Sequence, residues 1–214
     1  MKAAICSLII IICSILFLGT FSNLHALDKF HSYENYKTTY KLEGVKTGEK
    51  IFCSRNWGNE KVQIERVAIN ISPNETKKNN QKVITKIIDG EQWIYSINLD
   101  DNTGTKAKNP SFPALKESIK GKDPAEFGKF FLKQLGGEII GKKEILGIKC
   151  DIWKISVLQT CVSDKGIALE TRSDNPKLVE TATSIDTANT CSQDQFDVGD
   201  AKIKEIDINS LKQQ

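Results

Sequence analysis

The amino-acid sequence predicts an α+β fold dominated by antiparallel β-strands. Apolar and polar residues alternate along many short segments, which is the two-residue period of a strand with one buried face. Asp89-Gly90 lies between two such segments and has the composition of a tight hairpin turn. One well-marked helical pattern stands against about nine or ten expected strands, and this ratio favours a β-rich α+β domain.

The first half of the chain supplies expected strands on both sides of polar segments. Gly58-Asn59 is expected to reverse the chain between two strands, and Asp89-Gly90 reverses it again. We expect the polar segments 72–81 and 100–110 to be exposed loops. The expected strands here cover residues 36–43, 51–57, 62–71, 82–88 and 91–99.

Helix signals cluster in the middle of the chain. Asp123 can cap a helix, Pro124 suits its first turn, and Gly136-Gly137 would end it. A shorter helix is expected over 113–120. The longer helix carries an apolar stripe that must cover something apolar, formed by Phe127, Phe130, Phe131 and Leu135.

The second half of the chain returns to strands. Residues 148–155 alternate, and 160–162 and 167–169 are expected to be the strands that follow. Further strands are expected within 179–188 and 201–208. No glycine, asparagine, aspartate or proline marks a turn at 154–157, so the hairpin loop there has no defined length from sequence.

Length and charge limit the classes of function. A chain of 214 residues with 39% hydrophobic and 27% charged residues is long enough for one domain with a sizeable core. Its 30 basic and 27 acidic side chains are interspersed and give a net charge of +3. No segment has the density of positive charge that a phosphate backbone requires, so a nucleic-acid partner is not expected.

The N-terminus has the pattern of a secretory signal peptide. Lys2 precedes the apolar run Ala3–Leu18, the run breaks at Gly19, and Ala26 suits the small position before a cleavage site. A retained anchor is the alternative, but about 20 apolar residues are needed to span a bilayer. A lipoprotein would need a cysteine at the cleavage point, which neither Cys6 nor Cys13 provides.

Cleavage after Ala26 would leave one domain, residues 27–214, in the periplasm or outside the cell, with no transmembrane segment. Its four cysteines predict two disulfides, because oxidising compartments form and keep such bonds. Zinc is the competing interpretation, but there is no C-x-x-C pair and His31 is the only histidine that would remain. The absence of C-x-x-C also argues against a redox dithiol. Of three connectivities, we favour Cys150 with Cys161, which leaves Cys53 with Cys191.

Three stretches carry a family resemblance. "GKKEILGIKCDIWKI", "CVSDKGIALETRSD" and the upstream "KVITKIIDGEQWIYSIN" resemble a group of exported bacterial proteins related to the lipoprotein-carrier (LolA-like) half-barrel. The resemblance implies a strongly curved antiparallel sheet, an open half-barrel of about 9–11 strands, with one or two helices covering its concave face. Carriers of that class hold acyl chains there, although no ligand residue matches one for one.

The leading expectation is therefore an exported, non-enzymatic protein that binds a lipid or another apolar ligand in the half-barrel trough. The competing interpretation of the aromatic candidates is plain core packing. The alternative function is an envelope or secreted interaction module that contacts another protein through 72–81 and 100–110. The candidate lining residues are Trp93, Tyr95, Phe130, Phe131 and Trp153.

An enzyme is not expected. His31 lies among polar residues near the expected new N-terminus and is expected to be exposed. The sequence has no G-x-S-x-G elbow, no H-E-x-x-H and no glycine-rich phosphate loop, and it implies no metal or other cofactor.

Overall fold

The computed structural model describes residues 29–72, 74–188 and 191–207. The described residues contain two α-helices, α2 (Phe112–Ile119) and α3 (Pro124–Gln134), and two 3₁₀ helices, η1 (Asn56–Gly58) and η2 (Gln193–Phe196). The strands are β1 (Tyr36–Gly44), β2 (Lys46–Arg55), β3 (Glu60–Ser72), β4 (Glu75–Ile88), β5 (Glu91–Asn98), β6 (Thr103–Lys108), β7 (Glu138–Ile145), β8 (Ile148–Ile155), β9 (Leu158–Ser163), β10 (Ala168–Asp174), β11 (Lys177–Asp186) and β12 (Lys202–Glu205).

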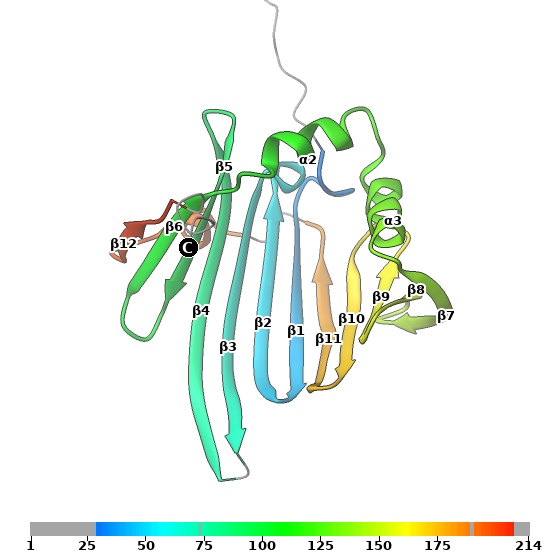
Figure 1. Ribbon diagram of the computed structural model, residues 1–214, viewed down its shortest axis with the longest axis horizontal. Helices are drawn as coiled ribbons and strands as arrows, with labels where there is room; N and C mark the ends of the chain where they lie inside the picture. The colour runs from blue at the N-terminus through cyan, green and yellow to red at the C-terminus, as the bar shows by residue number, and fades with distance from the viewer. Residues whose placement is uncertain (1–28, 73, 189–190, 208–214) are drawn as a thin grey trace, which may run out of the picture.

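All twelve of these strands belong to one sheet (Figure 1). Their order is β12-β6-β5-β4-β3-β2-β1-β11-β10-β9-β8-β7. Nearly all neighbours are antiparallel and joined by tight hairpins; β12 runs parallel to β6. The pairing of β1 with β11 joins the N-terminal and C-terminal halves of the chain into a continuous ladder.

The predicted helix-covered half-barrel is wrong. The protein is mostly β, and its sheet is neither closed nor strongly curled. The helices do not cover a sheet face either. Helix α3 buries only Ala125, while Phe130 and Phe131 remain 49% and 50% exposed. The apolar stripe predicted for this helix exists, but the sheet does not pack against its full length.

The strand register gives a further reason why no apolar trough forms. Tyr40 on β1 pairs with Lys50 on β2, and Lys50 pairs with Glu65 on β3, so these side chains share one face of the sheet. Glu180 on β11 lies on the same face and forms an ion pair with Lys50. An acyl chain lying here would have to desolvate these charges, which is unfavourable.

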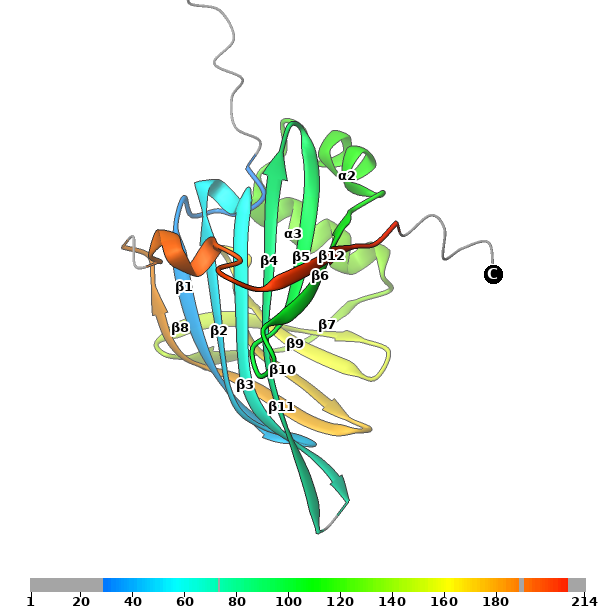
Figure 2. The same ribbon diagram turned by 90° about the vertical axis from the view of Figure 1, so that its left-hand side faces the viewer.

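The opposite face of the sheet is covered by the chain's own C-terminal segment (Figure 2). Phe196 of η2 is fully buried against a cluster on β2 to β5, and the Arg55 guanidinium lies 4.1 Å from its ring centroid. The cluster contains Cys53, Val62, Ile64, Ile84 and Ile97. The main apolar contact of this half of the sheet is therefore made with residues far along the chain.

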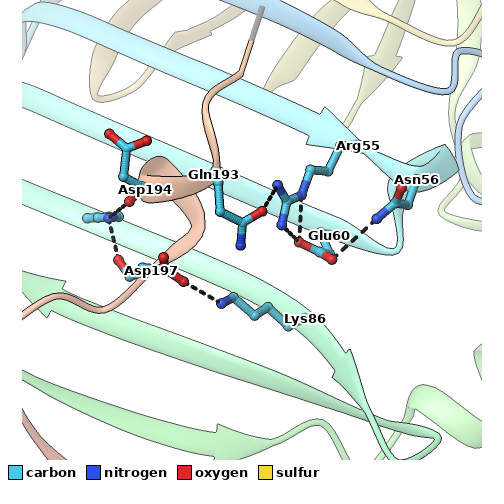
Figure 3. A network of polar contacts seen from close by, with 8 residues as sticks. Arg55, Asn56, Glu60, Lys86, Gln193, Asp194 and Asp197 are labelled. Atoms are coloured by element: carbon cyan, nitrogen blue, oxygen red, sulfur yellow. Dashed lines mark hydrogen bonds and ion pairs between the residues drawn. The ribbon is translucent and has the colours of Figure 1, made fainter. Parts of the chain in front are cut away.

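Polar contacts hold the C-terminal segment in place (Figure 3). Arg55 donates from Nη1 to Gln193 Oε1 at 2.5 Å and also contacts Glu60. Lys82 Nζ donates to the Asp197 carbonyl at 2.6 Å, and Lys86 Nζ lies 3.4 Å from Asp197 Oδ1. These bonds fix η2 across β2, β3 and β4.

Local signals in the sequence correctly predicted the helices and the central hairpin. Asp123 Oδ1 accepts from the backbone N–H groups of Ala125 at 2.9 Å and Glu126 at 3.2 Å, which confirms the predicted N-cap. Asp89 and Gly90 have φ angles of 52° and 79°, as a type I′ turn requires.

The two expected polar loops are wrong. Strand β3 ends at Ser72 and β4 already begins at Glu75, and β6 occupies 103–108. The end of the β3–β4 hairpin projects beyond the rest of the sheet (Figures 1 and 2). Both faces of this hairpin end are exposed to water, so its strands do not need alternating apolar and polar residues. The backbone pairing of β3 with β4 alone defines them.

Two disulfides are present. Cys150 on β8 and Cys161 on β9 have Cα atoms 5.3 Å apart, and Cys53 and Cys191 have Cα atoms 6.1 Å apart. These are the pairings favoured from the sequence, and they fit an extracellular or periplasmic location. The expected signal peptide lies outside the described residues. Within the described ranges, no helix is long and apolar enough to cross a membrane.

We predict that the two disulfides contribute unequally to stability. By the chain-entropy model, closing the 11-residue separation of Cys150–Cys161 is worth about 3 kcal/mol, and the 138-residue separation of Cys53–Cys191 about 5 kcal/mol. Urea unfolding of the double alanine variants should therefore show a larger loss for Cys53→Ala/Cys191→Ala. An equal loss of unfolding free energy in the two double variants would show that the polar contacts alone hold the C-terminal segment in place.

Candidate functional site

The aromatic residues expected to line one trough are not brought together. Trp93 and Tyr95 lie on β5, and Trp153 lies on β8, with seven strands between β5 and β8 in the sheet. Trp93 lies between the ammonium groups of Lys106 and Lys108, at 4.9 and 5.1 Å from its ring centroid.

Two of the five candidates are core residues. Trp153 is 2% exposed, and Tyr95 packs against the cluster that holds Phe196. Of the five candidates, only Phe131 lines one of the hollows described below. The trough expected from the sequence is replaced by a smaller site at α3.

Helix α3 lies next to two adjoining hollows. The first, the apolar hollow, has a volume of about 230 Å³. The second, the polar hollow, has a volume of about 220 Å³ and shares His31, Ser32, Pro124 and Lys165 with the first. The apolar hollow is lined chiefly by Phe30, Tyr33, Tyr36, Phe127, Phe131 and Ile167.

The polar hollow carries charges of both signs. Lys29 lies 3.8 Å from the centroid of the Trp57 ring, and both residues line this hollow. The hydroxyl of Ser32, which lines both hollows, is buried and has no hydrogen-bond partner among the described residues. The other polar groups around it belong to Asp123, Glu126, Asp164 and Lys165.

The wall formed by the N-terminal segment 29–35 is held by the turn at η1. The Phe30 N–H donates to the Trp57 carbonyl at 2.8 Å, and the Trp57 N–H donates to the Glu34 carbonyl at 2.9 Å. Gly58 follows with a φ of 87°, and a Cβ there would come within 3.0 Å of His31 and Phe30. Glycine at this position lets the segment lie directly on the turn.

The wall formed by α3 rests on the β9–β10 turn. Ser163 N–H donates to the Ile167 carbonyl at 2.9 Å and closes this turn, in which Gly166 has a φ of 79°. A Cβ on Gly166 would lie 3.7 Å from the Cα of Ala125, the one buried residue of α3. The first turn of α3 is thus fixed, while the rest of the helix extends past the hollow.

Gly128 contributes no side chain to the lining of the apolar hollow. It lies in the middle of α3 and lines the hollow, and a Cβ added there would meet no atom within 4 Å. Glycine in a helix interior costs about 1 kcal/mol relative to alanine. No neighbouring backbone lies so close that only glycine would fit at this position. The effect of Gly128 is that this part of the hollow holds no side chain.

His31 lies between the hollows and the sheet. Its Nδ1 is 2.7 Å from Ser54 Oγ, and its ring centroid is 5.3 Å from that of Tyr36. Burial, together with the smaller effect of the positive charge of Lys61, lowers the pKa of His31 to about 3. The expectation of an exposed histidine is therefore wrong. The backbone bonds at Trp57 draw the segment onto the sheet, which the polar composition around His31 did not indicate.

The pair of His31 and Ser54 resembles a base with a nucleophile, but its surroundings favour a structural role. Ser54 has no exposed surface, so its hydroxyl is not open to a substrate. Burial also raises the pKa of Tyr36, which keeps its phenol neutral, and lowers the pKa of Lys61. The bond from His31 to Ser54 ties the N-terminal segment to β2.

A larger cavity of about 460 Å³ lies at the other end of the helical region, between α2, the β4–β5 hairpin and β12. Glu91 and Lys108 form an ion pair at 2.5 Å on its rim. One wall is formed by Glu205, Ile206 and Asp207, where the described part of the chain stops. We assign the candidate site to the α3 hollows, because one of them is lined chiefly by aromatic side chains and adjoins a second, polar hollow.

The residues that the structure describes contain no group of three or more histidine, cysteine, aspartate or glutamate side chains placed to hold a metal ion. The hollows at α3 combine an aromatic lining with a few charged groups, which suits recognition of an organic molecule with an apolar part.

Comparisons with known proteins show the fold alone. No family model and no curated protein matches the chain. A solved structure of PNGF-II has a TM-score of 0.50 and 15% identity; the match covers 84% of this chain and 32% of that one. An uncharacterised conserved protein from Thermus thermophilus has a TM-score of 0.50 and 7% identity, over 84% and 94% of the two chains. This chain thus spans about a third of PNGF-II. Neither name connects it with the lipoprotein carriers.

The low pKa of His31 predicts an acid-sensitive stability. Below pH 6.5 the unfolded chain binds a proton at this histidine, whereas the folded protein does not until about pH 3. The free energy of unfolding should therefore fall as the pH drops through this range, with about 2 kcal/mol lost at pH 5 from this group.

His31→Asn should remove that part of the pH dependence while keeping a polar atom near Ser54. The measurement is urea unfolding of both proteins at pH 5 and pH 7.5, where the carboxylates common to both contribute equally. An identical pH dependence in the two proteins would contradict the assignment.

Proposed function

We propose that this protein is an exported, non-enzymatic binding protein that holds a small apolar or amphipathic molecule in the apolar hollow at α3. The single observation that carries the proposal is Gly128, a mid-helix glycine that faces a hollow lined by aromatic side chains and leaves it unfilled. Removal of residues 1–26 as a signal peptide belongs to the same proposal.

The dimensions of the site suit a compact apolar group. Ligand pockets for drug-sized molecules are usually about 300–1,000 Å³, so a hollow of about 230 Å³ fits one ring or a short alkyl chain. A long acyl chain does not fit within it. Phe127 and Phe131 have ring centroids 6.4 Å apart and present adjacent apolar surfaces to such a group.

The polar hollow defines the other end of the ligand. It adjoins the apolar hollow through His31, Ser32, Pro124 and Lys165, so one molecule can extend into both. Lys29 and Lys165 offer positive charge, the carboxylates around the hollow offer negative charge, and the hydroxyl of Ser32 offers a hydrogen bond. A small molecule with a compact apolar part and a polar or zwitterionic head group has the chemistry that fits both hollows.

Gly128→Leu should abolish binding by filling the apolar hollow, with little effect on folding because the added side chain enters open space. The measurement is titration with 1-anilinonaphthalene-8-sulfonate, followed by its displacement with short fatty acids and aromatic acids. We expect the affinity for the probe to fall at least about tenfold.

Two variants serve as controls. Gly128→Ala should stabilise the helix by about 1 kcal/mol and retain most of the affinity, because alanine occupies little of the space. Leu135→Ala removes an exposed apolar side chain from the same helix outside the hollow and should leave the affinity unchanged. Undiminished probe binding by Gly128→Leu would sink the proposal.

A further inference from the structure

Most of the large apolar side chains that remain exposed lie within one part of the chain. This part is 130–158, and its exposed apolar residues are Phe130, Phe131, Leu135, Ile139, Ile140, Leu146, Val157 and Leu158. The other exposed large apolar residues among those described are Ile71, Ile88 and Leu99, which are scattered over β3, β4 and the β5–β6 turn.

The fold brings all of these except Leu146 to one end of the sheet's β7 edge. Gly137 connects α3 to β7, and a Cβ there would lie 3.1 Å from Ile155, at the end of β8. Ile155 pairs with Leu158 across the β8–β9 turn, so Val157 lies in that turn beside the end of α3. We name Phe130, Phe131, Leu135, Ile139, Ile140, Val157 and Leu158 the edge patch.

Lysines surround the edge patch. Three lysines lie near it in the fold, namely Lys122, Lys133 and Lys154, the last of which lies opposite Glu138 on β7. Lys122 lies 5.3 Å from the centroid of the Phe130 ring. Lys133 in the last turn of α3 and Lys154 on β8 are exposed and form no ion pair with another described residue.

We infer that the edge patch docks on the surface of a lipid bilayer that contains anionic phospholipids. Exposed apolar side chains grouped at one edge mark an interaction surface. Apolar residues that enter the headgroup region, flanked by lysines that remain at its surface, are the arrangement that interfacial helices use on anionic membranes. Each lysine close to such a surface adds to the electrostatic attraction.

Features of β7 argue against a second copy of the chain as the occupant. Strand β7 is an edge of the sheet, but its register shifts between Ile139 and Gly141, and Lys142 and Lys143 follow directly. A bulge and edge lysines oppose the addition of another strand. The bilayer requires no such pairing, because side chains rather than backbone groups make the contact.

The test is sedimentation of the protein with vesicles of phosphatidylcholine, with and without phosphatidylglycerol. A chain that begins at Leu27 is used, since the apolar run Ala3–Leu18 would itself bind vesicles and every described element is retained. We expect the chain to bind the vesicles that contain phosphatidylglycerol and to lose most of this binding at high salt.

Leu135→Glu/Val157→Glu should lower the partition coefficient at least about tenfold, because it places negative charge within the edge patch. The matched control is Ile71→Glu, which alters an equally exposed residue (56%, against 53% for Leu135) far from the patch and should bind as the parent chain does. Lys133→Gln/Lys154→Gln should weaken binding about tenfold without changing the apolar surface.

Three results would overturn the inference: no binding of the parent chain to vesicles that contain phosphatidylglycerol, an equal loss in Ile71→Glu, or a dimer without vesicles that Leu135→Glu/Val157→Glu converts to a monomer. Circular dichroism of each variant confirms that it is folded. Gly128→Leu should still bind vesicles, so failure of the ligand proposal and failure of this one are distinguishable.

Discussion

The attachment of the C-terminal segment across β2 to β5 is the constraint on which the rest of the structure depends. Phe196 has no exposed surface, and the Cys53–Cys191 bond and the contacts of Arg55 hold it there. This segment takes the apolar face of half of the sheet. The other face carries the ion pair of Lys50 with Glu180, and the cost of desolvating these charges disfavours an extended apolar ligand there.

Among the described residues, most of the large apolar side chains that remain exposed lie at α3 and the adjoining β7 edge of the sheet. The helix is capped by Asp123 and seated on the β9–β10 turn through Ala125, and its remaining apolar side chains have little of the sheet to cover. Some of the apolar side chains of this helix line the hollow beside Gly128. Others, such as Leu135 at its end, are exposed to solvent. The binding and docking proposals thus arise from the same shortage of packing partners.

The N-terminal segment shows how a polar stretch becomes part of an interior. His31 lies between Phe30 and Ser32 in a stretch that is otherwise mostly polar, and this pattern does not indicate a buried histidine. Two backbone bonds to the Trp57 carbonyl place it over Tyr36 and Ser54, where burial lowers the pKa of its ring. Ser54 on β2 and Gly58 in the η1 turn contact this N-terminal segment. Sequence reasoning treated these residues separately and therefore missed this wall of the site.

Local chemistry in the sequence determined the hairpin at Asp89-Gly90 and the cap at Asp123, because each depends on neighbouring residues. The sequence also favoured the pair Cys150–Cys161, which lie 11 positions apart, and Cys53–Cys191 followed as the remaining pair. Only the tertiary structure decided which surfaces stay open. Whether Trp153 lines a trough or fills a core, and whether Phe131 is covered, depends on which segment lies against it. Which segment covers which side chain depends on competition among all apolar surfaces of the chain. The alternation of residues along one strand does not contain this information.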